Sequence, residues 1–382
     1  MPIDPVDLLV RLIKCKSVTP NEGGALSIIE DALRPNHFKC ERLNFGKGKD
    51  RVENLFARFG DNGPHFCFAG HVDVVPAGDS RSWLHPPFGG DIYEGKVFGR
   101  GAVDMKGSIA SYISSAIKWL KVNPGFEGSL SFLITGDEEG PAVNGTIKVL
   151  NWMKENQQIP DMCLVGEPTN KLHIGDTIKI GRRGSLNGKL SVFGKQGHVA
   201  YPHLAQSPFP IMIKMLEPLL MGELDKGTKD FPPSNASITS IDTGNSAVNI
   251  IPSRAEAKFN IRFNDSQDAN KLEMFLKSHF DKIDKNYKVD FYSNAEPFLT
   301  LPGKLITFVK NSIKNKTKIS PDLSTSGGTS DARFIAKYCP VVEFGLVGKT
   351  MHQINENVSI EDINLLSEIY YELFNEIFLA KN

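Results

Sequence analysis

Short apolar segments alternate with amphipathic segments through the first half of the chain. The apolar runs at 65–70, 129–135 and 161–166 each end in glycine or in polar residues, a pattern that is typical of buried strands. Helical periodicity fills the intervals between them, at about 106–121 and 143–156. This βαβ order predicts an α/β domain with a largely parallel sheet and helices on both faces.

The pattern changes near residue 180, where half-exposed strands and helices follow one another in a new order. The predicted elements are a strand at 185–193, a helix at 208–222, strands at 236–244 and 255–263, a helix at 267–282 and a strand at 287–293. The order β-α-β-β-α-β is that of a ferredoxin-like α+β domain. We therefore predict that residues 180–293 form a domain inserted into a first domain made of 1–179 and 294–382. The last part of that first domain carries a strand at 340–346 and a final amphipathic helix at 359–380.

Composition and charge exclude several classes of protein. Apolar residues make up 40% of the chain and charged residues 23%, which excludes intrinsic disorder as the main state. Lysine plus arginine equals aspartate plus glutamate at 44 each, so no general basic field would attract nucleic acid. No apolar run reaches the 18 or more residues of a membrane helix. At the N-terminus, Asp4 and Pro5 predict a helix cap rather than the basic segment of a signal peptide.

The cysteines indicate the compartment of the protein. There are five, at 15, 40, 67, 163 and 339, and no two form a Cys-x-x-Cys pair. An odd number without close spacing argues against a disulfide framework and against a thiolate zinc site. We expect five reduced, mostly buried thiols in a cytoplasmic protein.

Residues of metal-ligand type follow the predicted strands or lie in tight loops. They are His71 and Asp73, Asp104, Glu138 and Glu139, Glu167, and His352. Ligands of open α/β sheets gather at the carboxyl ends of strands, so these side chains are expected to converge. Each alone has a plainer explanation: a lone histidine is usually only hydrogen-bonded, and Asp104 suits a helix cap. Their joint occurrence favours a metal centre.

The set of donors indicates which metal, and how many ions. Two histidines and three carboxylates without sulfur suit Zn²⁺ or a similar divalent ion. One catalytic zinc needs about three protein ligands, whereas five suit two ions bridged by one carboxylate. Glu138 and Glu139 are neighbours and are expected to point in different directions, so one can bind metal while the other acts as a base. Asp73 is spaced to accept the second ring N–H of His71.

These motifs resemble the co-catalytic dizinc amidohydrolases, a family that includes acetylornithine deacetylase, aminoacylase and related carboxypeptidases and dipeptidases. The resemblance covers essentially the whole chain. It implies a zinc-hydrolase domain with a mixed sheet flanked by helices, and an inserted domain that serves as lid and dimerisation domain. Within the family, the runs 175–208 and 323–335 are similar to those of a member that removes succinate from N-succinyl-L,L-2,6-diaminopimelate.

The resemblance also implies a role for each metal-site residue. One zinc would be bound by His71, Asp104 and Glu167, and the other by Asp104, Glu139 and His352, with Asp104 as the bridge. Co²⁺ would be able to replace zinc at one site. Glu138 would be the general base, and the Asp104–Met105 peptide would be cis.

Further residues are implied on the substrate side. His198, from the inserted domain, would donate a hydrogen bond to the developing oxyanion, although an isolated histidine of this kind is usually a surface residue. The carboxylates of such a substrate are expected to be bound by arginine side chains, each of which can donate two parallel hydrogen bonds. Arg182 and Arg262 are the candidates. The remaining candidates are Tyr201, Asn249, Gly328 and Thr329. The relatives also imply a homodimer in which His198 comes from the partner subunit.

One departure and two alternatives accompany this interpretation. The resemblance implies asparagine at the position of Gly348, so one side-chain contact to substrate is expected to be missing there. The first alternative is a sibling activity on another small molecule, such as an acetylornithine deacetylase, another N-acyl amino acid amidohydrolase or a dipeptidase. The second is a catalytically silent binding protein, which would lack the base or a ligand.

Overall fold

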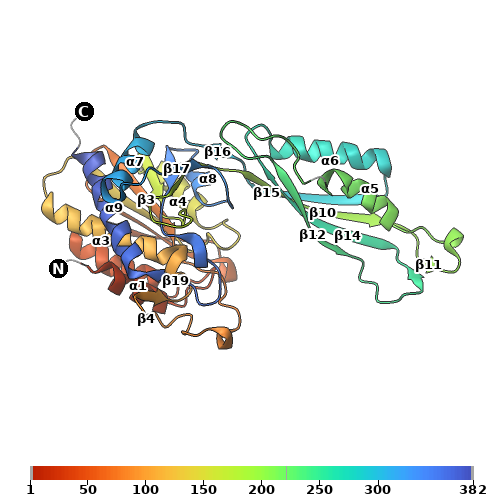
Figure 1. The fold of residues 1–382 in the computed structure, drawn as a ribbon, viewed down its shortest axis with the longest axis horizontal. Helices are drawn as coiled ribbons and strands as arrows, with labels where there is room; N and C mark the ends of the chain where they lie inside the picture. Colours follow the sequence, from red (N-terminus) through yellow and green to blue (C-terminus); the bar gives the residue numbers. More distant parts are fainter. Residues whose placement is uncertain (1–2, 221, 380–382) are drawn as a thin grey trace. The chain divides into compact units, whose positions relative to one another are not determined.

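The structure, a computed structural model, describes residues 3–220 and 222–379 and divides the chain into two compact units (Figure 1). Unit 1 runs up to Ile180 and includes Thr300–Ser324 and the chain from Ser330 onward, and unit 2 comprises Gly181–Leu299 and Thr325–Thr329. The sequence pattern placed the return to the first domain earlier, at residue 294. Residues 1–2 and 380–382 of the predicted first domain, and residue 221 of a predicted helix, lie outside the described residues.

Unit 1 is built on an eight-stranded mixed sheet with the order β1-β2-β6-β3-β7-β18-β8-β17. Its strands are β1 (Lys39–Phe45), β2 (Val52–Phe59), β3 (His65–His71), β6 (Ser129–Thr135), β7 (Met162–Val165), β8 (Thr177–Lys179), β17 (Asp322–Ser324) and β18 (Val341–Glu343). The central strands β6, β3, β7 and β18 are parallel, and β1 and β2 pair antiparallel with their neighbours. At the other edge, β8 pairs antiparallel with β18 and parallel with β17. β3 and β6 are buried along their whole length, as their continuous apolar runs predicted.

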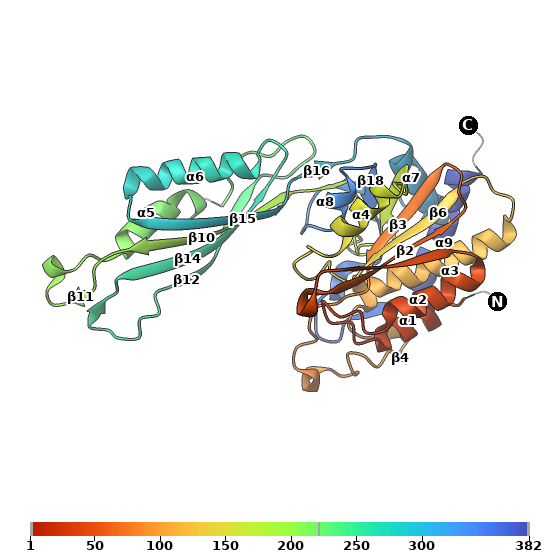
Figure 2. The same cartoon turned by 180° about the vertical axis from the view of Figure 1, so that it is seen from behind.

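Helices cover both faces of this sheet (Figure 2). They are α1 (Pro5–Lys14), α2 (Ala25–Leu33), α3 (Gly107–Val122), α4 (Thr146–Glu155), α7 (Lys304–Thr317), α8 (Ala332–Ile335) and α9 (Ile360–Phe378). The connections β3–α3–β6 and β6–α4–β7 run in opposite directions across the sheet, and right-handed crossovers then place α3 and α4 on opposite faces. A small sheet of β4 (Asp91–Tyr93), β5 (Lys96–Phe98) and β19 (Asn357–Ser359) completes the unit.

Unit 2 is a ferredoxin-like α+β domain, in agreement with the sequence pattern. Its antiparallel sheet has the order β12-β14-β10-β15. The main elements are β10 (Gly184–Phe193), α5 (Phe209–Leu220), β12 (Asn235–Asp242), β14 (Arg254–Phe263), α6 (Ala269–Ile283) and β15 (Tyr287–Ala295). Two further pairs of short strands are present. β9 (Gly181–Arg182) pairs with β16 (Phe298–Leu299), and β11 (Gly197–His198) pairs with β13 (Ile250–Ile251). Alternate residues of β10 and β14 pack with both helices in a hydrophobic core of the unit's own.

Other expectations concern the N-terminus and the cysteines. Asp4 caps α1, where its carboxylate accepts the N–H groups of Val6 and Asp7 at 2.9 Å, as the sequence predicted. All five cysteines are free and buried. Among the helices of the described part of the chain, none has the length and apolar character needed to cross a membrane.

Candidate metal centre

Three neighbouring parallel strands bring the candidate ligands to one edge of the unit 1 sheet. His71 is the last residue of β3, Glu138 and Glu139 follow β6, and Glu167 follows β7. Because the carboxyl ends of parallel strands meet at one edge, residues far apart in sequence become neighbours. Asp104 lies in the turn Ala102–Lys106, which directly precedes α3.

Asp104 lies between the two histidines and turns a different oxygen toward each. Its Oδ1 is 3.1 Å from Nε2 of His71, and its Oδ2 is 3.2 Å from Nε2 of His352. Nε2 of His352 is also 2.8 Å from Oε1 of Glu139, and Nε2 of His71 is 3.7 Å from Oε1 of Glu167. This is the arrangement expected of a carboxylate shared by two ions. The Asp104–Met105 peptide is cis, as the family resemblance implied.

The donor set fits a divalent metal ion. Ligands held about 2.0 Å from a tetrahedral zinc lie about 3.3 Å from one another, and the four contacts just given span 2.8 to 3.7 Å. Two groups of ligand atoms lie mutually within 4.8 Å: His71 with Glu138 and Glu167, and His71 with Asp104 and Glu139. All donors are nitrogen or oxygen, which suits zinc and its neighbours rather than thiolate-seeking metals.

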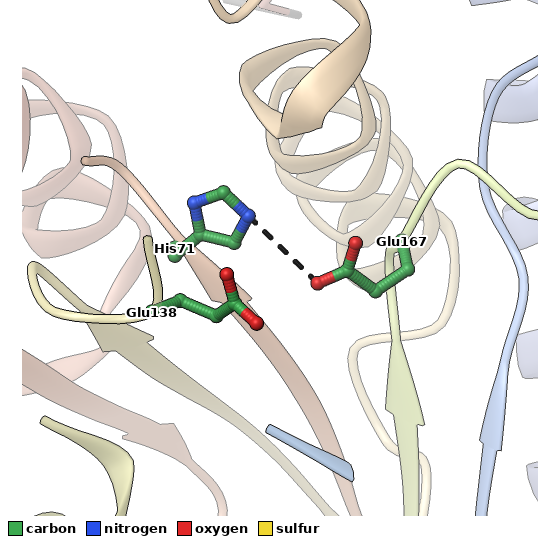
Figure 3. Close-up of side chains that lie close together, drawn as sticks. All are labelled: His71, Glu138 and Glu167. Atoms are coloured by element: carbon green, nitrogen blue, oxygen red, sulfur yellow. Dashed lines mark ion pairs between the residues drawn. The ribbon is translucent and has the colours of Figure 1, made fainter. Parts of the chain in front are cut away.

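Glu138 lies among the candidate ligands, beside His71 and Glu167 (Figure 3). Burial raises the pKa of its carboxyl well above the usual range, and the negative charge of Glu167 adds to that effect. A buried carboxyl group with a raised pKa is suited to accept and return a proton, as a general base must.

Carboxylates outnumber cationic groups in the cluster. Burial alone would lower the pKa of His71, but the hydrogen bond to Asp104 and the charges of Asp104, Glu138 and Glu167 raise it well above its usual value. Hydrogen bonds to Asp104 and Glu139 raise the pKa of His352 to about 10. The cluster therefore attracts positive charge, which a divalent cation can supply.

Asp73 contacts the ring of His71 through its backbone oxygen and not through its carboxylate. Its carboxylate accepts the backbone N–H groups of Glu138 and Glu139, at 3.2 and 3.0 Å. Nδ1 of His71 instead lies 2.9 Å from the backbone oxygen of Asp73 and 3.7 Å from Oδ1. Asp73 therefore accepts the second ring N–H of His71 with its backbone oxygen, while its carboxylate binds the loop after β6. Burial raises the pKa of Asp73 to about 6.

The predicted substrate residues of unit 2 fall into two groups, and the first lies near β9 and β16. Nη1 of Arg182 donates to the backbone oxygen of Gly328 at 3.1 Å. Arg262 lies opposite Ser185 at the start of β10. Nη1 of Arg262 and Oγ1 of Thr329 are buried, and neither has a hydrogen-bond partner within the described residues. Such unsatisfied buried donors are suited to a bound carboxylate.

The second group gathers around β11, at the other end of the unit 2 sheet (Figure 1). The rings of His198 and Tyr201 lie 5.8 Å apart, and the backbone N–H of Val199 donates to the oxygen of Asn249 at 3.1 Å. Arg182 precedes β10 and His198 follows it, and ten residues of strand span roughly 30 Å. Unit 2 therefore keeps the two groups far apart.

Two buried charged residues near the centre were not singled out by the sequence pattern. Arg100 and Glu356 form an ion pair at 2.7 Å, with 3% and 0% of their side chains exposed. Their closeness in sequence to two candidate ligands could have pointed to them, since Arg100 lies four residues before Asp104 and Glu356 four residues after His352.

Comparisons with known proteins identify the family of the chain. A family model described as peptidase family M20/M25/M40 matches residues 67–376. The chain belongs to this family. One relative, the succinyl-diaminopimelate desuccinylase of Rhodospirillum centenum, is 50% identical over 376 residues, which cover 98% of this chain and 97% of the relative. Another with the same name, from Parvibaculum lavamentivorans, is 47% identical over 100% of this chain and 97% of its own.

Solved structures of the family share the fold at low sequence identity. The metallo-carboxypeptidase Sso-CP2 of Sulfolobus solfataricus matches with a TM-score of 0.81 and 18% identity, over 98% of this chain and 99% of its own. A protein from Bacillus subtilis described as a dinuclear metal binding peptidase matches with a TM-score of 0.68 and 16% identity, over 96% and 97% of the two chains. The predicted α/β fold class and the family resemblance are thereby confirmed.

Proposed function

We propose that this metal-dependent amidohydrolase converts N-succinyl-L,L-2,6-diaminopimelate and water into succinate and L,L-2,6-diaminopimelate. The observation that carries the hydrolytic chemistry is the position of Asp104 between two histidines, with the buried carboxyl of Glu138 in the same cluster. The choice of substrate is supported by the names of relatives that are 47 to 50% identical along nearly the whole chain. A silent binding protein is disfavoured, because every ligand and the base are present.

Two zinc ions are the cofactors of this proposal. His71, Asp104 and Glu167 would hold one ion, and Asp104, Glu139 and His352 the other, with Co²⁺ able to replace zinc at one site. Zinc, when bound, polarises an amide carbonyl and lowers the pKa of bound water to about 7. Glu138 is kept free of this ligand set, so that its carboxylate is available for proton transfer.

Glu138 moves the proton of the reaction. It accepts a proton from the attacking water as the bond between water oxygen and carbonyl carbon forms. It returns that proton to the amide nitrogen as the carbon–nitrogen bond breaks, which releases succinate and a free amine. Asp73 holds the backbone N–H groups of Glu138 and Glu139 and thereby fixes the direction of both side chains.

The substrate carries three carboxylates, and unit 2 supplies cationic and neutral donors for them. Arg182 and Arg262 offer guanidinium forks, and Thr329 offers a hydroxyl, in the group that also includes the backbone of Gly328. A guanidinium recognises a carboxylate through two parallel hydrogen bonds, which gives both affinity and orientation.

A homodimer formed through unit 2 would allow the second group of substrate residues, around β11, to contact substrate. One small molecule is too short to reach both Arg182 and His198 of the same unit 2, which are separated by the length of β10. In our proposal His198, Tyr201 and Asn249 are the group that acts on the site of the partner subunit, as the family resemblance implies for His198, which donates there to the oxyanion. Five free, buried thiols suit a cytoplasmic location.

Hydrolysis by the purified protein tests the proposal. N-succinyl-L,L-2,6-diaminopimelate and N-acetylornithine are compared after treatment with a chelator and again after addition of Zn²⁺. We expect activity only with Zn²⁺ present, and a higher kcat/KM for the succinylated substrate. A higher kcat/KM for N-acetylornithine would replace the proposed substrate with that of the sibling enzyme.

A further inference from the structure

Arg100 and Glu356 join two segments that lie far apart in sequence. Arg100 precedes the turn Ala102–Lys106, and Glu356 precedes β19. Nη1 of Arg100 is 2.7 Å from Oε2 of Glu356, and both side chains are almost wholly buried. A buried ion pair is weak evidence for stability, because removing two charges from water costs about as much as their attraction returns. The remaining hydrogen bonds of the pair therefore decide its role.

Glu356 is hydrogen-bonded to the backbone at Val103 and Asp104. Its second oxygen, Oε1, accepts the N–H of Val103 at 2.9 Å and the N–H of Asp104 itself at 3.2 Å. Backbone N–H donors to a carboxylate form charge-assisted hydrogen bonds, which are the stronger kind. The carboxylate thus fixes the residue whose two oxygens face His71 and His352.

Arg100 fastens the opposite segment, which carries His352. Its Nη1 donates to the backbone oxygen of Gln353 at 3.2 Å, and its Nη2 to that of His352 at 3.3 Å. His352 and Asn355 both have φ of 61°, a left-handed conformation that non-glycine residues adopt at a cost. The guanidinium holds this strained loop in place and stacks at 5.2 Å over the ring of Trp83.

We propose that Arg100 and Glu356 are positioning residues of the metal centre. Together they fix the backbones of Asp104 and His352, whose side-chain atoms lie 3.2 Å apart, so that both ligands are held at the distance one ion needs. Neither residue contacts the ligand atoms directly. The inference rests on the proposed function, since it assumes that Asp104 and His352 bind metal.

Metal affinity of two conservative variants tests this role. Arg100→Lys keeps the charge but loses the fork that reaches several carbonyls, and Glu356→Gln keeps the size but faces donors on both sides. Zn²⁺ is titrated by calorimetry into the chelator-treated proteins, and Co²⁺ absorption spectra are recorded. Loss of such an outer partner typically weakens metal binding by about 10–100-fold, and we expect this for at least the ion bound by His352.

The control is Glu30→Gln. Glu30 lies on α2, where it pairs with Arg34 and Arg42 at 2.7 and 2.6 Å and is 13% exposed. It has no contact with a candidate ligand within the described residues, so its loss should leave the affinity for both ions unchanged.

The outcomes separate positioning from simple stabilisation. If both variants melt at a lower temperature but bind both ions as tightly as the wild type, the pair serves stability alone and the inference is overturned. If Arg100→Lys does not fold, Glu356→Gln decides by the same comparison. If the wild-type protein itself binds no ion, the proposed function fails first, and the inference fails with it.

Discussion

Glu138 and Glu139 are adjacent in sequence but differ in what surrounds them. Glu139 contacts His352, whereas Glu138 lies beside His71 and Glu167. Glu138→Ala should retain the metal ions and lower kcat by about 10²–10⁴-fold, because only proton transfer is removed. Glu139→Ala should lose the ion shared with His352. Metal analysis and steady-state kinetics check both variants, and equal metal loss in the two would contradict the division of roles.

Arg182 and Arg183 form a second pair of neighbours with different surroundings. The guanidinium of Arg183 donates to the backbone oxygen of Pro233 and to Oδ1 of Asn235, whereas that of Arg182 donates to the backbone oxygen of Gly328. Arg182→Ala should lower kcat/KM for the succinylated substrate by about 100-fold, mainly through KM, because a carboxylate loses a bidentate partner. Arg183→Ala is the matched control, and kinetics equal to the wild type in both variants would remove Arg182 from the site.

Sequence alone located these residues but not their contacts. His71, Asp104, Glu139 and His352 were recognisable because their residue types are rare together and follow strands or tight loops. The sequence predicted Asp73 as the partner of Nδ1 of His71 but not which of its oxygens accepts, because whether the carboxylate or the carbonyl of Asp73 faces the ring depends on the fold of the loop after β6. That loop is more than sixty residues away in sequence.

At the scale of elements, continuous apolar runs and long amphipathic segments were predictable, and very short elements were not. β3, β6, α3 and α9 lie within a few residues of their predicted bounds. β8 and β17 have three residues each, too few for any periodicity, and only their pairing with each other and with neighbouring strands makes them strands. The antiparallel pairing of β1 and β2 at one edge of the sheet could likewise not be predicted, because pairing direction is a property of the whole sheet and not of one strand.

β3 also carries a titratable group away from the metal centre. His65 is 5% exposed, and its Nε2 lies 2.7 Å from Oγ of Ser131 on β6. Burial, aided by the charge of Arg58, lowers its pKa from 6.5 to about 4. The unfolded chain therefore binds a proton between about pH 6.5 and 4 that the folded chain does not, so the free energy of unfolding falls as pH falls through this window.

Replacement of His65 should flatten that dependence. Below about pH 4, protonation of His65 should lower the free energy of unfolding by about 3 kcal/mol in all. The His65→Gln variant should lack this part of the pH dependence and keep the part that comes from other titratable groups. Urea unfolding at several pH values measures the difference, with the exposed His37→Gln as control. An identical pH slope in wild type and His65→Gln would show that His65 protonates equally in both states.

At the scale of the whole molecule, the separation of the two substrate groups along β10 leads to a test of the dimer. His198→Ala and Glu138→Ala are each inactive in our proposal, and they are co-expressed. In a mixed dimer, one site takes Glu138 from its own chain and His198 from the partner subunit. Random pairing makes about half of the dimers mixed, so about a quarter of wild-type activity should return. If His198 acts within its own chain, mixing restores nothing.

The burial of every cysteine has a consequence for oxidative stress. Peroxides attack the thiolate, and burial raises the pKa of Cys40 to about 11 and that of Cys163 well above its usual value. The candidate ligands of the metal centre are nitrogen and oxygen atoms, so no sulfur in the ligand set can be oxidised to release an ion. Catalysis should therefore outlast a peroxide exposure that disables enzymes dependent on a reactive thiol, and residual activity after graded peroxide treatment would measure that tolerance.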